Sequence, residues 1–390
     1  MNHGVKFYMS DAPEQLTHAD KPNVYHMWKG EQGMGALTKS LLENKNATIM
    51  YYTEGKKILV DAKGKIAGVQ ALTEEGKLVD IHSKAVVIAT GGFIGNQQML
   101  DEQHIVGYPL SWRYNNGGGL QMAWAAGAQK FKPNLTLYHA TMITTRDNRM
   151  SPFIGGLAPF IHIPVLWVDK EGKRYYNEEQ VYDNALVANA LVSVGGKGFI
   201  VFDQAMVDKF KIAKTGLHDS FANISVDRVI PGGQSGPLPN VQKDLDGAAK
   251  DNTVFKADTL EKLAEKAGFD KDAFIQQVAD YNKYVQTGKD EQFGKPAEYM
   301  KYNVKKGPFY ALEVTVVNLA TIGGLKVNEK LETLDNNDKP IDGLYAVGNV
   351  SQANMYSDGY PLIEGLALCY ATVSGRIAGK YSAEYVKSAH

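Results

Sequence analysis

The sequence predicts an α/β protein with a parallel sheet and an inserted α+β region, on three observations. Residues 86–89 are apolar at every position, which is typical of a strand buried on both faces of a parallel sheet. Residues 344–347 form a second short apolar run, and glycines follow both runs closely, at Gly91 and Gly348. Between the two runs, residues 137–312 mix short strands, loops and two amphipathic helices.

Length and charge narrow the class of protein. A chain of 390 residues with 44% apolar composition can bury a large core, and two or three domains are expected. The formal net charge of −1, with both signs interspersed, gives no footprint for nucleic acid or an anionic membrane. No segment approaches the roughly 20 continuous apolar residues of a membrane span. The first residues lack a signal peptide's apolar core, so we expect a cytoplasmic protein unless a missing N-terminal segment changes this.

Cys369 is the only cysteine. An internal disulfide, a cysteine metal site and covalent haem attachment are therefore excluded, and no metal is predicted. Cys369 falls within an apolar helix pattern that starts near Pro361 and includes Leu366, Leu368 and Val373. We expect this helix to be buried and Cys369 to be a small core residue, with a reactive thiol as the alternative.

The N-terminal part is read as a helix over residues 36–42, opened by Gly33 and Gly35, and then a β-rich stretch to Thr90. These glycines do not form a dinucleotide-binding fingerprint, which consists of a strand, then G-x-G-x-x-G, then a helix. That fingerprint occurs nowhere in the chain. Turn signals punctuate the β-rich stretch and predict hairpins, at residues 54–55, 63–64 and 75–76. The strands expected between them cover residues 49–52, 58–60, 66–72 and 78–81.

Three further helices follow from glycine stops and capping residues. Residues 120–127 form a helix after a glycine run and end at Gly127. Asp258 is the expected N-cap of a helix that ends at Gly268. Residues 270–287 place four apolar side chains on one face, namely Phe274, Val278, Tyr281 and Val285. Residues 213–256 are rich in Gly, Pro, Asn and Asp and are expected to be mostly loop.

Four motifs carry a family resemblance: KAVVIATGGF at residues 84–93, GGGL at 117–120, VDKEGKRYYNE at 168–178, and GLYAVGNV at 343–350 followed by GRIAG at 375–379. In this order they resemble the FAD-dependent fumarate reductase and succinate dehydrogenase flavoprotein superfamily, especially its soluble fumarate, urocanate and 3-ketosteroid branch. The resemblance implies a flavin-binding domain in two parts, residues 1–136 and 313–390, with a capping domain at residues 137–312.

One part of the family pattern is absent. The family's first βαβ unit carries the glycine fingerprint for the FAD pyrophosphate, and Met1 aligns after that unit should have ended. The flavin domain is therefore expected to be a truncated Rossmann-like domain. Three explanations stay open: the chain is a fragment, a second chain completes the domain, or FAD binding is weakened or lost.

The resemblance implies FAD as the cofactor and assigns its contacts residue by residue. Glycines in these positions let backbone approach a dinucleotide, although residues 89–92 could equally be an ordinary strand-ending turn. Two departures weaken the match: Gly118 stands where the family has Asp, and Asn349 replaces a Glu. The predicted cofactor-binding residues are Ala89, Thr90, Gly91, Gly92, Gly117, Gly119, Gly323, Gly348, Asn349, Leu366 and Ala367.

The family's catalytic arginine is replaced. In fumarate-reducing members flavin N5 delivers hydride and an arginine donates the proton; the matching position, eight residues after Arg174, is Tyr182. Tyrosine is neutral with a pKa near 10, so the resemblance implies proton transfer on a less anionic substrate. The alternative is a packing tyrosine before a helix. His139 aligns with a substrate-binding histidine, and Arg174 and Tyr360 complete the predicted catalytic set, with Tyr360 as the alternative proton relay.

Several other residues that contact an acidic substrate in the family are also replaced in this sequence. Ala320 stands where the family has a substrate-binding histidine, and residues 158–162 lack the family's proton-relay residues. These losses favour a hydrophobic or aromatic substrate in a pocket lined by Met355, Tyr356, Tyr360 and Leu362, unless those side chains are ordinary packing.

We therefore expect an FAD-dependent oxidoreductase that acts on a carbon–carbon double bond of a non-fumarate small molecule by flavin N5 hydride transfer. Its electron donor is not identified by the sequence. The alternative is a catalytically inactive or partner-dependent truncated flavoprotein-like binding protein.

Overall fold

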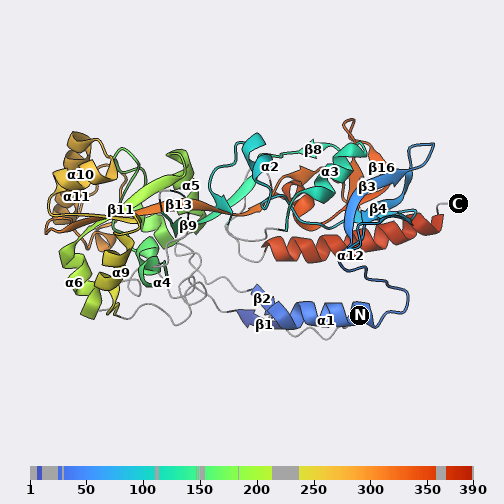
Figure 1. Cartoon of the computed structure of the whole chain (residues 1–390), viewed down its shortest axis with the longest axis horizontal. Coiled ribbons are helices and arrows are strands. Elements are labelled where there is room, and N and C mark those ends of the chain that lie inside the picture. Colours follow the sequence, from blue (N-terminus) through green and yellow to red (C-terminus); the bar gives the residue numbers. More distant parts are fainter. Residues whose placement is uncertain are drawn as a thin grey trace.

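A computed structural model describes residues 7–10, 25–28, 30–109, 114–145, 147, 149, 154–182, 184–212, 237–356 and 366–388. The molecule is elongated, with two lobes joined by strands β13 and β9 (Figure 1). Near the N-terminus β1 (Phe7–Ser10) and β2 (Tyr25–Trp28) pair antiparallel and precede α1 (Gly30–Leu42). Across the described segments, no helix combines the length and apolar character needed to cross a membrane.

The first lobe, on the right of Figure 1, is built around a parallel strand pair. β6 (Val86–Ile88) runs parallel to β16 (Pro340–Ala346), and β15 (Glu332–Leu334) pairs antiparallel with the other edge of β16. An antiparallel meander lies beside them: β3 (Glu54–Val60), β4 (Ile66–Leu72) and β5 (Leu78–His82). The remaining elements of this lobe are α2 (Gln97–Glu102), α3 (Gly118–Ala125), β8 (Lys130–Phe131), β14 (Gly324–Leu325), η4 (Gly348–Val350), η5 (Gln352–Asn354) and α12 (Leu366–Ser388).

The second lobe contains a sheet of six strands, β10-β11-β13-β12 with β7 and β9 also paired to β13. Its strands are β7 (Tyr108–Pro109), β9 (Thr136–Ile143), β10 (Leu166–Val168), β11 (Lys197–Asp203), β12 (Val254–Ala257) and β13 (Phe309–Thr321). Its helices are α4 (Ile154–Leu157), η1 (Ala158–His162), η2 (Glu178–Tyr182), α5 (Asn184–Ser193), α6 (Gln204–Ile212), α9 (Val241–Ala248), α10 (Leu260–Ala267), α11 (Lys271–Thr287) and η3 (Ala297–Tyr299).

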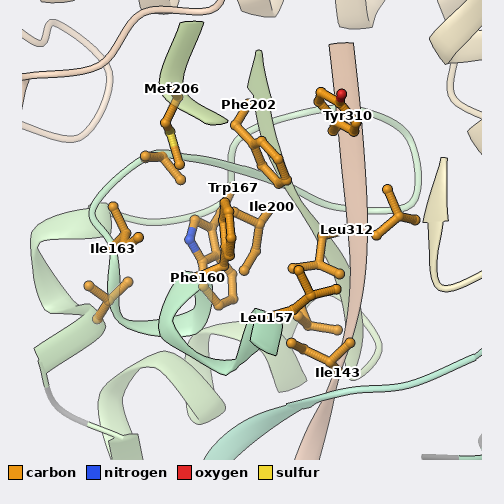
Figure 2. Close-up of a cluster of buried hydrophobic side chains, with 14 of the residues drawn as sticks. Ile143, Leu157, Phe160, Ile163, Trp167, Ile200, Phe202, Met206, Tyr310 and Leu312 are labelled. Atoms are coloured by element: carbon orange, nitrogen blue, oxygen red, sulfur yellow. The ribbon is translucent and has the colours of Figure 1, made fainter. Parts of the chain in front are cut away.

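Each lobe has its own apolar core. In the second lobe Trp167 of β10, Phe160 of η1 and Phe202 of β11 are almost fully buried and belong to one apolar cluster (Figure 2). A separate cluster fills the first lobe, with Leu120 and Leu344 at zero exposure. This mixed arrangement confirms the α/β class, while the domain boundaries at residues 136 and 312 stay predictions.

Several predicted elements are confirmed and others are wrong. Turns at Gly64 and Gly76, both with positive φ, join β3, β4 and β5 as expected. The strand predicted at residues 49–52 is wrong, because this segment pairs with no described strand and ends in a turn. Residues 54–55 lie inside β3 and are not a turn. Residues 213–236 lie outside the described residues, but the loop predicted after them is wrong in part, since it contains α9 and β12.

The observed bounds of α10 and α11 agree closely with the two amphipathic helices predicted from the sequence. Asp270 caps α11 through a bond from the Ala273 amide, and α11 ends at Gly288. The first of the pair, α10, ends at Gly268 as expected, but its N-cap is Thr259, one residue after the predicted Asp258. The shift is small because Thr and Asp both accept bonds from helix N–H groups.

The prediction that β6 is buried on both faces is wrong. It pairs in parallel with β16, but the Val87 side chain is 40% exposed. β6 stands at the end of the β15-β16-β6 sheet, and no other described strand pairs with its second edge. The apolar sequence fits a strand whose two faces are both covered, whereas the described residues cover only one face of β6.

The burial predicted for the last helix is also wrong. Only Ser374 and Ala378 are buried in α12, whereas Leu368 and Val373 are 49% and 48% exposed. Cys369 is exposed and is not a core residue. α12 lies along the lower side of the first lobe and contacts it through one narrow stripe (Figure 1). Residues 361–365, the predicted start of this helix, lie outside the described residues.

Candidate active site

The register of β6 and β16 brings two distant segments together. Ile88 lies opposite Ala346, and the Val347 amide donates to the Ile88 carbonyl at 3.0 Å. The turns that follow the two strands, residues 89–92 and 347–350, therefore lie side by side at the carboxyl edge of the sheet. Ligands of open α/β sheets bind at this edge.

The first turn is packed closely against two other segments. Gly91 has φ +74°, a conformation that suits glycine. A Cβ on Gly92 would lie 2.0 Å from Thr321 Oγ1, and a Cβ on Gly119 would lie 2.1 Å from Thr90 Oγ1. The turn thus has room for backbone only, and the end of β13 and the start of α3 hold it in place.

The start of α3 carries a side-chain acceptor beside one departure from the family pattern. Gly117, with φ +79°, occupies the N-cap position of α3. The Gly118 amide donates to Asn116 Oδ1 at 2.9 Å. Asn116 therefore supplies a side-chain acceptor beside the position where the expected Asp is absent.

The second turn is fixed by α12. Gly348 has φ +66°, and its amide donates to the Ser374 hydroxyl at 3.1 Å. The hydroxyls of Ser351 and Tyr370 lie 3.0 Å apart, which makes a second link between this turn and α12. Sequence reasoning missed these residues, because a serine or tyrosine within a helix pattern gives no signal of a long-range bond.

The remaining predicted cofactor contacts lie around the same edge. Gly323 passes so close to the Lys132 carbonyl that a Cβ would lie 1.8 Å from it. Asn349 is half-buried in η4, and Leu366 and Ala367 are half-buried at the start of α12. Their contacts to a ligand stay predictions.

The shared edge of β6 and β16 is partly open to solvent. Ala89 and Thr90 are exposed there, and Gly348 is half-buried. The first turn is therefore open to solvent at Ala89 and Thr90, and that this edge holds a dinucleotide stays a prediction. A cavity of about 1040 Å³ opens elsewhere, in the second lobe beside α9, and is lined by Arg149, Asn240 and Lys243 among others.

The predicted catalytic residues that can be placed belong to the second lobe. His139 lies in β9, and Tyr182 is the last residue of η2; the side chains of both fall outside the described part. η1 contacts both β9 and η2, so the segments that carry His139 and Tyr182 meet through η1. Tyr360 lies outside the described residues.

Arg174 is completely buried, and its guanidinium is occupied. It donates to both oxygens of Glu178 at 2.7 Å and to both oxygens of Asp290 at 3.0 and 2.9 Å. Burial opposes the charged form, but the two carboxylates outweigh it and raise the pKa of Arg174. The structure therefore places Arg174 in an internal ion cluster, with its donor fork already paired.

His162, at the end of η1, is a buried imidazole. Its side chain is 3% exposed, and it bonds to the Val181 backbone, immediately before Tyr182. Burial lowers the pKa of His162 to about 4, an effect that the Val181 bond opposes. Nε2 has no hydrogen-bond partner among the described residues.

Two of the four residues expected to line an aromatic pocket can be placed. Tyr356 is 4% exposed, and its hydroxyl accepts a bond from Gln352 Nε2 at 3.1 Å. Met355 is 46% exposed. Tyr360 and Leu362 lie outside the described residues, so a pocket lined by all four stays a prediction.

Comparison with known proteins gives consistent matches. The family model described as FAD binding domain matches residues 10–362. Vinyl phenol reductase of Lactiplantibacillus plantarum is 30% identical over 93% of this chain and 73% of its own length. NADH:acrylate oxidoreductase of Vibrio harveyi is 27% identical over 92% of this chain, which spans only 32% of that protein. The crystal structure of 3-ketosteroid Δ1-dehydrogenase from Sterolibacterium denitrificans superposes with a TM-score of 0.67 and 22% identity, over 94% of this chain and 65% of that one.

Proposed function

The chain belongs to the FAD binding domain family, and on this basis we propose that it is an FAD-dependent oxidoreductase acting on a carbon–carbon double bond of a non-fumarate substrate. The observation that carries the proposal is the shared edge of β6 and β16. Two glycine turns lie there side by side, with Ala89 and Thr90 exposed and Gly91 and Gly348 half-buried. The second lobe supplies the segments with the candidate acid and substrate-binding residues.

The chain's residues have distinct tasks in this proposal. The turns at residues 89–92 and 348–349 would hold FAD, which supplies hydride at its N5 atom. Tyr182 donates a proton from its hydroxyl to the substrate carbon beside the one that receives hydride. His139 binds a polar group of the substrate and orients it.

Two features of this chain, and the name of one relative, support a substrate that is not a dicarboxylate. Tyr182 stands where the fumarate-reducing members have a permanently charged arginine. Arg174, eight residues earlier, has its guanidinium N–H groups bonded to Glu178, Asp290 and Gln292, so it offers no free donors for a substrate carboxylate. Vinyl phenol reductase, the 30% identical relative, is named for an aromatic alkene.

The test is a substrate panel with the purified, FAD-loaded protein. Reduced under anaerobic conditions, the flavin should be reoxidised by a vinylphenol or an enone, and fumarate should have no effect. Tyr182→Phe should retain the flavin spectrum and lose most of the reoxidation rate, on the order of the 10²-fold or more attributed to general acids. Reoxidation by fumarate alone would refute the proposed substrate class, and an FAD-loaded protein whose reduced flavin no alkene of the panel reoxidises would refute the enzyme function.

A second proposal concerns the completeness of the FAD site. β6 is a parallel strand with one edge unpaired among the described strands, and Val87 is 40% exposed. Parallel sheets are normally covered on both faces, which favours a further strand-helix unit against β6. We infer that such a unit, in the same polypeptide or in a second chain, strengthens FAD binding.

Substitution on β6 tests this proposal. Val87→Asp should leave this chain folded, because the Val87 side chain is exposed. It should weaken FAD binding when the further strand-helix unit is present. Leu78→Asp, at a 55% exposed position on β5, is the matched control and should leave FAD affinity unchanged. Equal FAD affinity in both variants would argue against a docked unit at β6.

A further inference from the structure

Four buried charges meet where η2 begins. Arg174, Glu178, Asp290 and Lys295 have side-chain exposures of 0 or 1%. The cluster contains two positive and two negative groups, so its formal charges balance. Groups of this kind are rarely buried unless they are paired.

Arg174 binds both carboxylates through its planar fork. Each carboxylate receives two bonds from the guanidinium, all between 2.7 and 3.0 Å. Burial opposes ionisation of Asp290, but the bonds from Arg174 and from two backbone amides lower its pKa to about 2. The cluster is therefore fixed in one geometry that a monodentate cation could not reproduce.

Glu178 is the residue where the cluster joins η2. Besides Arg174, its carboxylate lies 3.4 Å from Lys295 Nζ and accepts a bond from the Trp167 amide at 3.4 Å. Lys295 Nζ also donates to the Pro164 carbonyl at 2.6 Å. The first residue of η2 is thus tied to β10 and to the loop that follows α11.

The other end of η2 is held independently. His162 bonds to the backbone of Val181, one residue before Tyr182. A 3₁₀ helix rises about 2 Å per residue, so Tyr182 lies roughly 8 Å from Glu178 along the axis. η2 is therefore held at both ends, and loss of the Glu178 bonds would release its first residue and let the short helix pivot about the His162 contact.

We propose that Arg174, Asp290 and Lys295 are positioning residues that act through Glu178 to fix η2 and hence the location of Tyr182. This inference rests on the proposed function of Tyr182 as proton donor. Buried ion pairs contribute little net stability compared with apolar residues of similar volume. What the cluster supplies is a fixed set of directional bonds at the start of the helix that carries the acid.

The test removes one charge of each sign. Glu178→Gln with Lys295→Met leaves the Arg174 and Asp290 pair intact and releases η2. We expect kcat to fall on the order of tenfold while KM changes by less than about twofold, because the acid and not substrate binding is displaced. Val278→Ala, a buried position of α11 outside the cluster, is the matched control for lost packing and should leave kcat unchanged.

A double-mutant cycle assigns the effect to Tyr182. In a Tyr182→Phe background the paired substitution should lower kcat by less than about twofold, since the displaced hydroxyl is already absent. An equal loss in both backgrounds, or an equal loss in Val278→Ala, would overturn the proposal. Should the paired variant not fold, Arg174→Lys carries the same test, because it keeps the charge but loses the fork.

A measurement without turnover separates this inference from the proposed function. Fluorotyrosine at position 182 should give one sharp ¹⁹F resonance in the parent chain and a broadened or multiple signal in the paired variant. An unchanged resonance would overturn the positioning role. If Tyr182→Phe keeps full activity while the resonance still broadens, the proton-donor assignment fails and the positioning of η2 stands.

Discussion

The Thr321 hydroxyl accepts a hydrogen bond of 2.9 Å from the Phe93 amide, across 228 residues of sequence. Both residues have zero exposure. The bond joins the last residue of β13 to the residue that follows the glycine turn after β6, so it helps to fix that turn.

Thr321→Val should destabilise the first lobe. Valine keeps the shape of threonine but leaves the buried Phe93 amide without its acceptor, which costs about 1–3 kcal/mol of unfolding free energy. Urea denaturation would measure the change, and Thr321→Ser, which retains the hydroxyl, should keep most of the stability. A valine variant as stable as the parent would show that this bond is dispensable.

Gly119→Ala should weaken FAD binding about tenfold or more. The new Cβ would lie 2.1 Å from Thr90 Oγ1, so the turn at residues 89–92 must move away from α3. Gly375→Ala is the matched control, because a Cβ there meets no atom within 4 Å. Flavin fluorescence titration compares the two, and equal affinities would contradict the close approach described for Gly119.

Stability should fall as pH is lowered from about 6.5 to about 4. The pKa of His162 is about 4 in the folded chain and near 6.5 when unfolded. Within this window the unfolded chain binds the extra proton, which lowers the unfolding free energy by up to about 3 kcal/mol. His162→Gln should flatten the profile there. Below about pH 4 both states are protonated, and a loss that continued to pH 2 would be expected from Asp290 instead.

Cys369 should react with a thiol reagent in the native chain. Its side chain is exposed on α12, so labelling should proceed within about tenfold of the rate in denaturant. Cys369→Ser should abolish the signal. Protection of Cys369 in the isolated native chain would contradict the exposed face of α12.

The sequence predicted the parts of the fold that depend on local rules. The glycine turns at Gly64 and Gly76 and the helix end at Gly268 all require a residue that tolerates positive φ. The meeting of the turns after β6 and β16 was also predictable, because the motifs of a known family lie in order along the chain.

Burial and long-range pairing were not predictable in the same way. An apolar pattern shows that Val87 and Leu368 suit a covered surface, but it does not say whether this chain supplies the cover. The same reason explains the missing strand at residues 49–52, since a strand forms only where a partner strand is available. Arg174 and Asp290 lie 116 residues apart, and no local pattern indicates their bond.

β13 runs from the second lobe into the first and connects them. Its first half pairs with β11 and β12 in the second lobe, and its last residue, Thr321, bonds to the turn at Phe93 (Figure 1). Its pairing with β9 is irregular between Val316 and Ala320, which is where such a strand bends most easily. Rotation of one lobe would therefore be absorbed as torsion in these few residues, one to five positions before the bond that sets the glycine turn.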